Sequence, residues 1–127
     1  MNVTFRQATA QDAPAIHRLI AQNLEAGHLL PRSLDDVTTH AVRFLVAEFE
    51  GAVVGCGELA PLSVDVAEVR SLVVDQHARG RHIGPRLVEQ LAAAGAAKGF
   101  ATLCAFTHEP AHFVRLGFTI VPHMWVP

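Results

Sequence analysis

The chain has 127 residues, half of them hydrophobic, and a formal net charge of −2. This length predicts one domain, 1–127, and the apolar content excludes intrinsic disorder. The basic residues are nine arginines and one lysine without a basic stripe or tail, which argues against a nucleic-acid partner. No apolar run approaches the ~20 residues of a membrane span, and the N-terminus lacks a signal-peptide core. With Cys56 and Cys104 both inside apolar runs, we expect a soluble cytoplasmic protein with free thiols.

The first half of the chain predicts a strand, two helices and a hairpin, over residues 3–7, 12–26, 33–41, 44–50 and 52–59. Asp12 and Ser33 are suited to cap the two helices, and the hairpin turns at Glu50-Gly51. The second half predicts two further strands, a long helix, a short helix and a last strand. The two strands cover residues 66–74 and 101–106, and the long helix between them starts near Pro85. The short helix covers residues 110–116, and the last strand covers residues 118–121. Proline is tolerated in a first helical turn, and it is expected to keep Gly84 outside the helix.

The turn between the third long strand and the long helix has the chemistry of an anion site. The first N–H groups of a helix have no partner inside it, and the helix dipole favours negative charge there. Arg79, Arg81 and Arg86 add positive charge that can pair with phosphate oxygens. An ordinary turn with surface arginines is the alternative interpretation, because short glycine motifs are common.

The segment from Arg79 to Gly84 resembles the acetyl-CoA motif of GNAT N-acetyltransferases, Arg/Gln-x-x-Gly-x-Gly/Ala. Arg79 and Gly84 match its ends, whereas His82 stands where the family usually has its first glycine. The predicted order β-α-α-β-β-β-α-β-α-β is also the GNAT order. The resemblance implies an α/β (α+β) fold with a mixed central sheet flanked by helices, and acetyl-CoA as cosubstrate without a metal. It implies acetyl-CoA contacts by Leu72, Val73, Val74, Arg79, Gly80, Arg81, His82, Ile83, Gly84, Pro85 and Phe113.

The usual last GNAT strand is missing from this pattern. Either the chain is a shortened form, or another subunit covers the open edge, as in a homodimer.

The strand 66–74 carries two opposite charges, Glu68 and Arg70, within an apolar run. Alternation places Glu68, Arg70 and Leu72 on one face unless a bulge intervenes. Glu68 and Arg70 can form a structural ion pair. Alternatively, Glu68 takes the proton of an attacking amine, directly or through water. GNAT enzymes often have a glutamate here, so Glu68 is our expected base, with Glu58 on the preceding strand in reserve.

By the same resemblance, the backbone from Leu72 to Val74 binds pantetheine, and one of its N–H groups faces the thioester oxygen.

The acid that protonates the leaving thiolate is not indicated. GNAT enzymes often use a tyrosine, but this chain has none, and Phe113 stands at its usual position. His108, His112, Cys56 or a water could serve, or the thiolate could leave unassisted. The run from His108 to His112 spells the zinc-protease motif His-Glu-x-x-His. That motif needs both histidines on one helical face, and Pro110 is expected to start the helix after His108, so we expect no metal here.

A second resemblance concerns the acceptor. The run from Gln22 to Ser33 is similar to a segment of amino-acid N-acetyltransferases of the N-acetylglutamate synthase type. This implies that Arg32 helps to hold a substrate carboxylate, although a solvated arginine beside a helix cap is the alternative. Arg70 is a second candidate, and His108 replaces another substrate-binding arginine of that family.

We therefore expect an acetyl-CoA-dependent N-acetyltransferase for a small amine, such as glutamate, acting by direct attack in a ternary complex. Another GNAT acceptor (a polyamine, an antibiotic or a protein N-terminus) and a non-catalytic acyl-CoA-binding module are the alternatives.

Overall fold

The computed structural model describes residues 2–24 and 29–106, and these build one mixed sheet with helices on both faces. The spatial order of the strands is β1-β2-β3-β4-β5. Neighbours are antiparallel except β4 and β5, which are parallel. The strands are β1 Val3–Gln7, β2 Phe44–Phe49, β3 Ala52–Pro61, β4 Val66–Val74 and β5 Thr102–Cys104.

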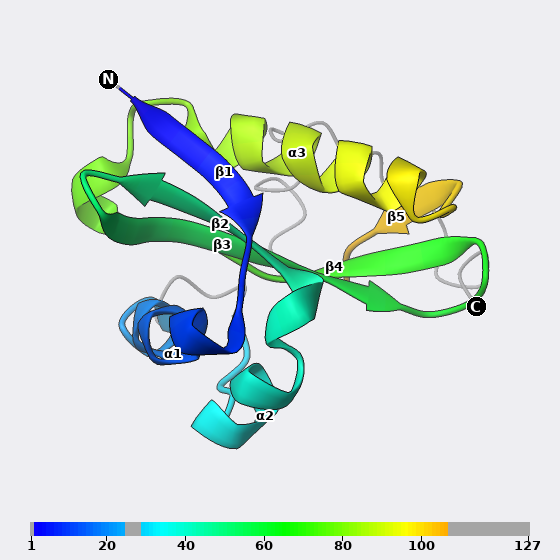
Figure 1. Cartoon of the computed structure of the whole chain (residues 1–127), viewed down its shortest axis with the longest axis horizontal. Helices are drawn as coiled ribbons and strands as arrows, with labels where there is room; N and C mark the ends of the chain where they lie inside the picture. Colours follow the sequence, from blue (N-terminus) through cyan, green and yellow to red (C-terminus); the bar gives the residue numbers. More distant parts are fainter. Residues whose placement is uncertain (1, 25–28, 107–127) are drawn as a thin grey trace.

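Within the described ranges, three α-helices flank this sheet: α1 Ala13–Ala21, α2 Leu34–Thr39 and α3 Ile83–Ala97. Short 3-10 turns occur at Ala10–Asp12, Ala41–Arg43 and Gln76–Ala78. Figure 1 shows α3 along one face of the sheet and α1 and α2 below the other. The Ser33 hydroxyl accepts a hydrogen bond from the Asp36 N–H at 3.1 Å and so caps α2, as its sequence predicts.

The core lies on both sides of the sheet because each face meets an amphipathic helix. Ile16 and Ile20 of α1 pack with Phe44 and other apolar side chains of the sheet. On the opposite face, Leu87 and Leu91 of α3 pack with the inward side chains of β3 and β4. The face of the sheet that packs against α1 and α2 also carries the charged residues described below.

Several predicted boundaries are confirmed and two are wrong. The strand 66–74 and the hairpin turn at Glu50-Gly51 occur as expected. Helix α1 ends at Ala21, earlier than predicted, and α3 begins at Ile83, so that Gly84 is helical. The predicted elements at 110–116 and 118–121 lie outside the described residues.

A β-bulge in β4 changes which side chains share a face. Cys56 pairs with Val73 and Glu58 pairs with Arg70, so Gly57 alone faces two residues of β4. Ser71 has the left-handed φ of 53° that this irregularity requires. Leu72 therefore packs in the core cluster that faces α3 and not on the face of Glu68 and Arg70, which is the exception that alternation allows where a bulge intervenes.

The acid sensitivity of the fold should depend on Asp12. Its carboxylate accepts two hydrogen bonds from Arg6, at 2.8 and 2.9 Å, which lowers the pKa of Asp12 to about 2 from 3.8. A depressed pKa stabilises the fold above the unfolded value, and that stability is lost as pH falls through the folded value. We expect the melting temperature of the wild type to exceed that of Asp12→Asn above about pH 4, and the difference to shrink as pH falls and to vanish below about pH 2. Circular dichroism melts across this range would measure it; a constant difference would contradict the assignment.

Candidate active site

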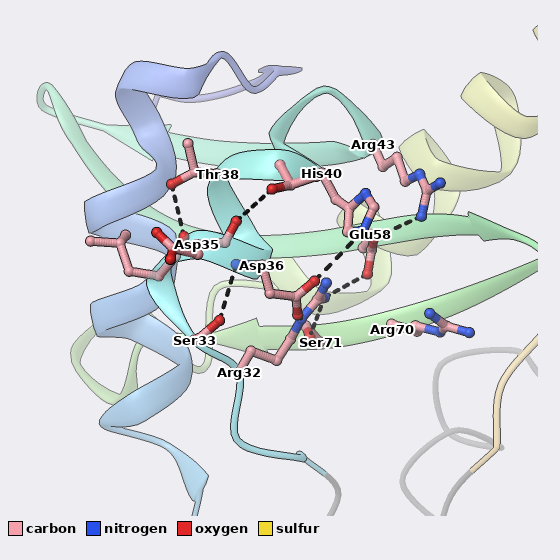
Figure 2. A network of polar contacts seen from close by, with 12 residues as sticks. Arg32, Ser33, Asp35, Asp36, Thr38, His40, Arg43, Glu58, Arg70 and Ser71 are labelled. Carbon is pink, nitrogen blue, oxygen red and sulfur yellow. Dashed lines mark hydrogen bonds and ion pairs between the residues drawn. The ribbon is translucent and has the colours of Figure 1, made fainter.

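A buried ion pair lies at the centre of the α1 and α2 side of the sheet. Arg32 Nη1 donates to Glu58 Oε1 at 2.5 Å, and Arg32 Nε donates to Asp36 Oδ2 at 2.7 Å. The Glu58 side chain is fully buried and that of Arg32 is only 10% exposed. Figure 2 shows the Arg32 side chain between α2 and the strands β3 and β4, which carry Glu58 and Ser71. Arg32 thus joins the segment before α2 to the middle of the sheet.

The pair is further held by aromatic and polar contacts. The Arg32 guanidinium lies 5.3 Å from the centroid of the Phe44 ring, a cation–π contact. Arg32 Nη1 also donates to Ser71 Oγ at 3.1 Å, at the bulge of β4. Arg43 Nη1 lies 3.8 Å from Glu58 Oε2, and among the described residues that buried oxygen has no hydrogen-bond donor. Glu58 is therefore a buried carboxylate whose Oε1 accepts a hydrogen bond from Arg32, whereas its Oε2 has only the more distant cation of Arg43 nearby.

Glu68 and Arg70 form a second, more accessible pair on the same face. Arg70 Nε donates to Glu68 Oε1 at 2.7 Å, and the two side chains are 45% and 13% exposed. Arg70 stands opposite Glu58 in the ladder between β3 and β4. The structural pairing considered from the sequence is therefore confirmed, and it leaves Glu68 beside an exposed arginine.

The sequence did not predict that Glu58 is the partner of Arg32. The two residues are 26 positions apart, and the available signal was a single acidic residue inside the apolar run of β3. The structure brings Arg32, Glu58 and Arg70 to one region and places Glu68 next to them. His108, His112 and Phe113 lie outside the part of the chain that is described.

The end of β4 has one edge that β5 does not cover. β5 pairs only with residues Val66 to Glu68 of β4. Beyond this point the Asp75 N–H donates to the Val54 carbonyl at 2.7 Å, so alternation of the ladder directs the backbone groups of Val74 away from β3. The Val74 carbonyl accepts from Arg79 Nε at 3.3 Å. The Val74 N–H therefore points to the edge that β5 leaves uncovered within the described residues, and its contact with acetyl-CoA stays a prediction.

The turn before α3 has the backbone geometry of an anion-binding loop. Gly80 and His82 both adopt left-handed conformations, with φ of 83° and 59°. The helix starts directly after them at Ile83, so the N–H groups of Ile83 and Gly84 belong to its unpaired first turn. The left-handed φ explains why a glycine suits position 82, and the backbone keeps this conformation with histidine there. The expected binding of a phosphate group by these backbone N–H groups stays a prediction.

The three arginines of this region have other contacts in the structure. Arg79 Nη2 donates to the Asn23 side chain at 3.1 Å, near the end of α1. Arg81 and Arg86 lie over the rings of Phe49 and Phe5, at 5.6 and 4.9 Å from the ring centroids. The expected role of these arginines in phosphate binding stays a prediction.

Replacing His82 by glycine should stabilise the protein. A side chain at a left-handed φ costs roughly 1 kcal/mol, which glycine avoids at some cost in chain entropy. We expect His82→Gly to raise or preserve the free energy of unfolding, and Gly80→Ala, which introduces the same strain, to lower it by about 1 kcal/mol. Urea unfolding would measure both, and a clear destabilisation by His82→Gly would contradict the assigned backbone strain.

Cys56 is a poor candidate for the acid. Its side chain is fully buried, its Sγ donates to the Ser71 carbonyl at 3.4 Å, and burial raises the pKa of the thiol to about 12. A thiol with so high a pKa is a weak proton donor, and its thiolate fraction near pH 8 is only about 10⁻⁴. We expect the folded Cys104→Ser variant to show no reactive thiol toward Ellman's reagent until it is unfolded. Rapid reaction of the folded variant would place Cys56 at an accessible position instead.

Metal ligands and membrane-spanning helices were both considered for the described residues. No group of three or more His, Cys, Asp or Glu residues within 2–24 and 29–106 is arranged to hold a metal ion. None of the helices found there combines the length and apolar character needed to cross a bilayer.

Comparisons with known proteins identify a family and several relatives. Residues 10–118 match the sequence model of the acetyltransferase (GNAT) family. The chain is 33% identical to an uncharacterized N-acetyltransferase of Chlorobaculum tepidum, over 96% of this chain and 79% of that protein. It is 35% identical to the amino-acid acetyltransferase of Mycobacterium tuberculosis, over 90% of this chain and 67% of that protein.

A solved structure extends the comparison to the fold. N-acetylglutamate synthase from Neisseria gonorrhoeae, complexed with coenzyme A and N-acetyl-glutamate, superposes with a TM-score of 0.91 and 29% identity. The match covers 100% of this chain and 30% of the synthase chain. The chain likewise spans about a quarter of the longer amino-acid acetyltransferases that it matches, such as that of Ectopseudomonas mendocina. The expected mixed sheet with flanking helices is confirmed by this superposition.

Proposed function

Because the chain belongs to the GNAT acetyltransferase family, we propose that it transfers acetyl from acetyl-CoA to the amine of an amino acid. The observation that carries this proposal is the position of Glu68 and Arg70. A carboxylate and an exposed arginine lie together where β4 leaves its pairing with β5. The site thus joins a proton acceptor to a carboxylate-binding cation at the open edge of the sheet.

The donor is bound by backbone groups in this proposal. The N–H groups of Ile83 and Gly84 meet the pyrophosphate, because the start of α3 concentrates unpaired donors and positive dipole there. The backbone of β4 from Leu72 to Val74 runs beside the pantetheine arm. The Val74 N–H, directed away from β3, is the donor best placed for the thioester oxygen.

The acceptor is bound by side chains on the α1 and α2 face. Arg70 holds Glu68 through Nε, and its terminal Nη atoms make no hydrogen bond within residues 2–24 and 29–106, so we expect them to bind a carboxylate. The amine of the same molecule then lies near Glu68, which takes its proton directly or through water. The neutral amine attacks the thioester carbon in a ternary complex, and coenzyme A leaves as the thiol.

The relatives support an amino acid as the acceptor. The Mycobacterium tuberculosis relative is named an amino-acid acetyltransferase, and the Neisseria gonorrhoeae structure contains N-acetyl-glutamate. Glutamate is therefore the reference acceptor for this chain, and Arg70 is the arginine proposed to bind its α-carboxylate.

Release of free thiol from acetyl-CoA would test the proposal across the twenty amino acids, several polyamines and peptides with free N-termini. We expect turnover with amino acids and none with polyamines or peptides. Turnover confined to polyamines or to peptide N-termini would overturn the amino-acid assignment. Thermal stabilisation by acetyl-CoA without turnover of any amine would favour a binding module instead.

A further inference from the structure

Arg32 is already occupied by carboxylates of the protein itself. We infer that Glu58 is a specificity-determining residue, an internal carboxylate that takes the place of a second substrate carboxylate at Arg32. The preferred acceptor is then an amino acid with an uncharged side chain, and glutamate is a poorer one. This inference rests on the proposed function and refines its substrate class.

The donor atoms of Arg32 show why it cannot clamp a substrate carboxylate. A guanidinium binds a carboxylate through two parallel N–H groups on neighbouring nitrogens. Nε is used by Asp36 at 2.7 Å, and Nη1 is used by Glu58 and by Ser71. Of these nitrogens, Nη2 alone has no bond to a described residue, so a substrate can receive single contacts but no two-nitrogen fork.

The charges of the ion pairs that the described residues form here also balance. Three arginines (Arg32, Arg43 and Arg70) stand against three carboxylates (Asp36, Glu58 and Glu68), each joined to an opposite charge at 4 Å or less. An amino acid with an uncharged side chain enters as a zwitterion and preserves this balance. A dicarboxylate adds a negative charge beside two carboxylates, and like charges brought together in a partly desolvated site repel strongly.

The Glu58 carboxylate cannot readily break its ion pair with Arg32 to make room for a substrate carboxylate. Its side chain is fully buried, and it comes from the middle of a strand paired on both sides. If Glu58 separated from Arg32, a buried carboxylate would be left without its partner, which costs free energy. Asp36, at 39% side-chain exposure on α2, is the partner that a ligand could displace more readily.

The test compares acceptors that differ only in the side-chain charge. Values of kcat/KM would be measured for glutamate against glutamine and for aspartate against asparagine, in the wild type, Glu58→Gln and Asp36→Asn. Glu58→Gln keeps the shape and the hydrogen-bond acceptor while removing the charge. We expect the wild type to favour the amides by about tenfold or more, and Glu58→Gln to shift each acid-to-amide ratio toward the acid by about tenfold. Asp36→Asn should shift it in the same direction by less.

A matched control separates a local effect from the loss of one charge. Glu48 on β2 also pairs with an arginine, Arg6, at 3.1 Å and is part-exposed, so Glu48→Gln should leave both ratios unchanged. A wild type that favours the acids, or ratios unmoved in Glu58→Gln, would overturn the role of Glu58 while leaving amino-acid acetylation intact. If Glu58→Gln does not fold, the wild-type ratios and Asp36→Asn decide. Absence of turnover with every amino acid would overturn the proposed function and this inference with it.

Discussion

Replacing Glu68 by glutamine is expected to lower kcat/KM by about 10²- to 10⁴-fold, the range typical of losing a positioned proton acceptor. Acetyl transfer needs a neutral amine, and Glu68 is the accessible carboxylate at the point where β4 parts from β5. Glutamine still offers an oxygen to Arg70 Nε, which donates to Glu68 at 2.7 Å. The loss should therefore fall on the chemical step and not on the placement of Arg70.

The pH profile distinguishes this role from a structural one. We expect the deficit of Glu68→Gln to shrink as rising pH supplies more neutral amine from solution. Glu89→Gln, an exposed change on α3 across the sheet, serves as the control and should keep wild-type activity. An unchanged kcat/KM for Glu68→Gln at every pH would exclude Glu68 as the base and direct attention to Glu58.

Removing Arg32 should have the largest effect on stability. We expect Arg32→Ala to lower the free energy of unfolding by about 3–5 kcal/mol, the usual cost of leaving a buried charge without its partner. The charge left behind is Glu58, whose other oxygen already lacks a hydrogen-bond donor among the described residues. Urea unfolding followed by circular dichroism would measure the change.

Two comparisons make this prediction specific to the buried pair. Arg43→Ala removes a cation that is 36% exposed and 3.8 Å from Glu58, so it should cost about 1 kcal/mol or less. The double variant Arg32→Ala with Glu58→Ala should be more stable than Arg32→Ala alone, because it leaves no buried charge. Equal costs for Arg32→Ala and Arg43→Ala would contradict the picture of a buried, tightly coupled pair.

The sequence predicted correctly those strands and turns whose conformation depends mainly on residues next to one another in the chain. The strand Val66–Val74 followed from an apolar run with turn signals on both sides. The hairpin turn followed from Glu50-Gly51, whose φ values of 52° and 79° belong to a tight turn between antiparallel strands.

The two wrong helix boundaries have tertiary or stereochemical causes. The Asn23 side chain donates to the Leu19 carbonyl at 2.8 Å and accepts from Arg79, which turns the chain away from the helix after Ala21. That contact with a residue 56 positions away is not visible in the local pattern. At α3, proline restricts a preceding residue largely through its Cβ, and Gly84 has none, so it joins the helix.

The candidate site was predicted where its residues are neighbours in the chain. Glu68 and Arg70 share a strand face, so alternation alone predicts that they can meet. The partnership of Arg32 with Glu58 depends on how the segment before α2 crosses the sheet, which no local pattern specifies. The bulge at Ser71 was equally hidden, because serine is not a residue that marks a left-handed φ.

Mass spectrometry of the acceptor after reaction with acetyl-CoA, alongside the thiol released, tests the central claim most directly. The account predicts one acetyl group on the α-amine of an amino acid for each thiol formed, with both products strongly reduced in Glu68→Gln. Thiol release without an acetylated amine would show that water, and not an amine, is the acceptor. Acetyl-CoA left intact with every amine, while it stabilises the fold, would show that the chain binds the donor without catalysing transfer.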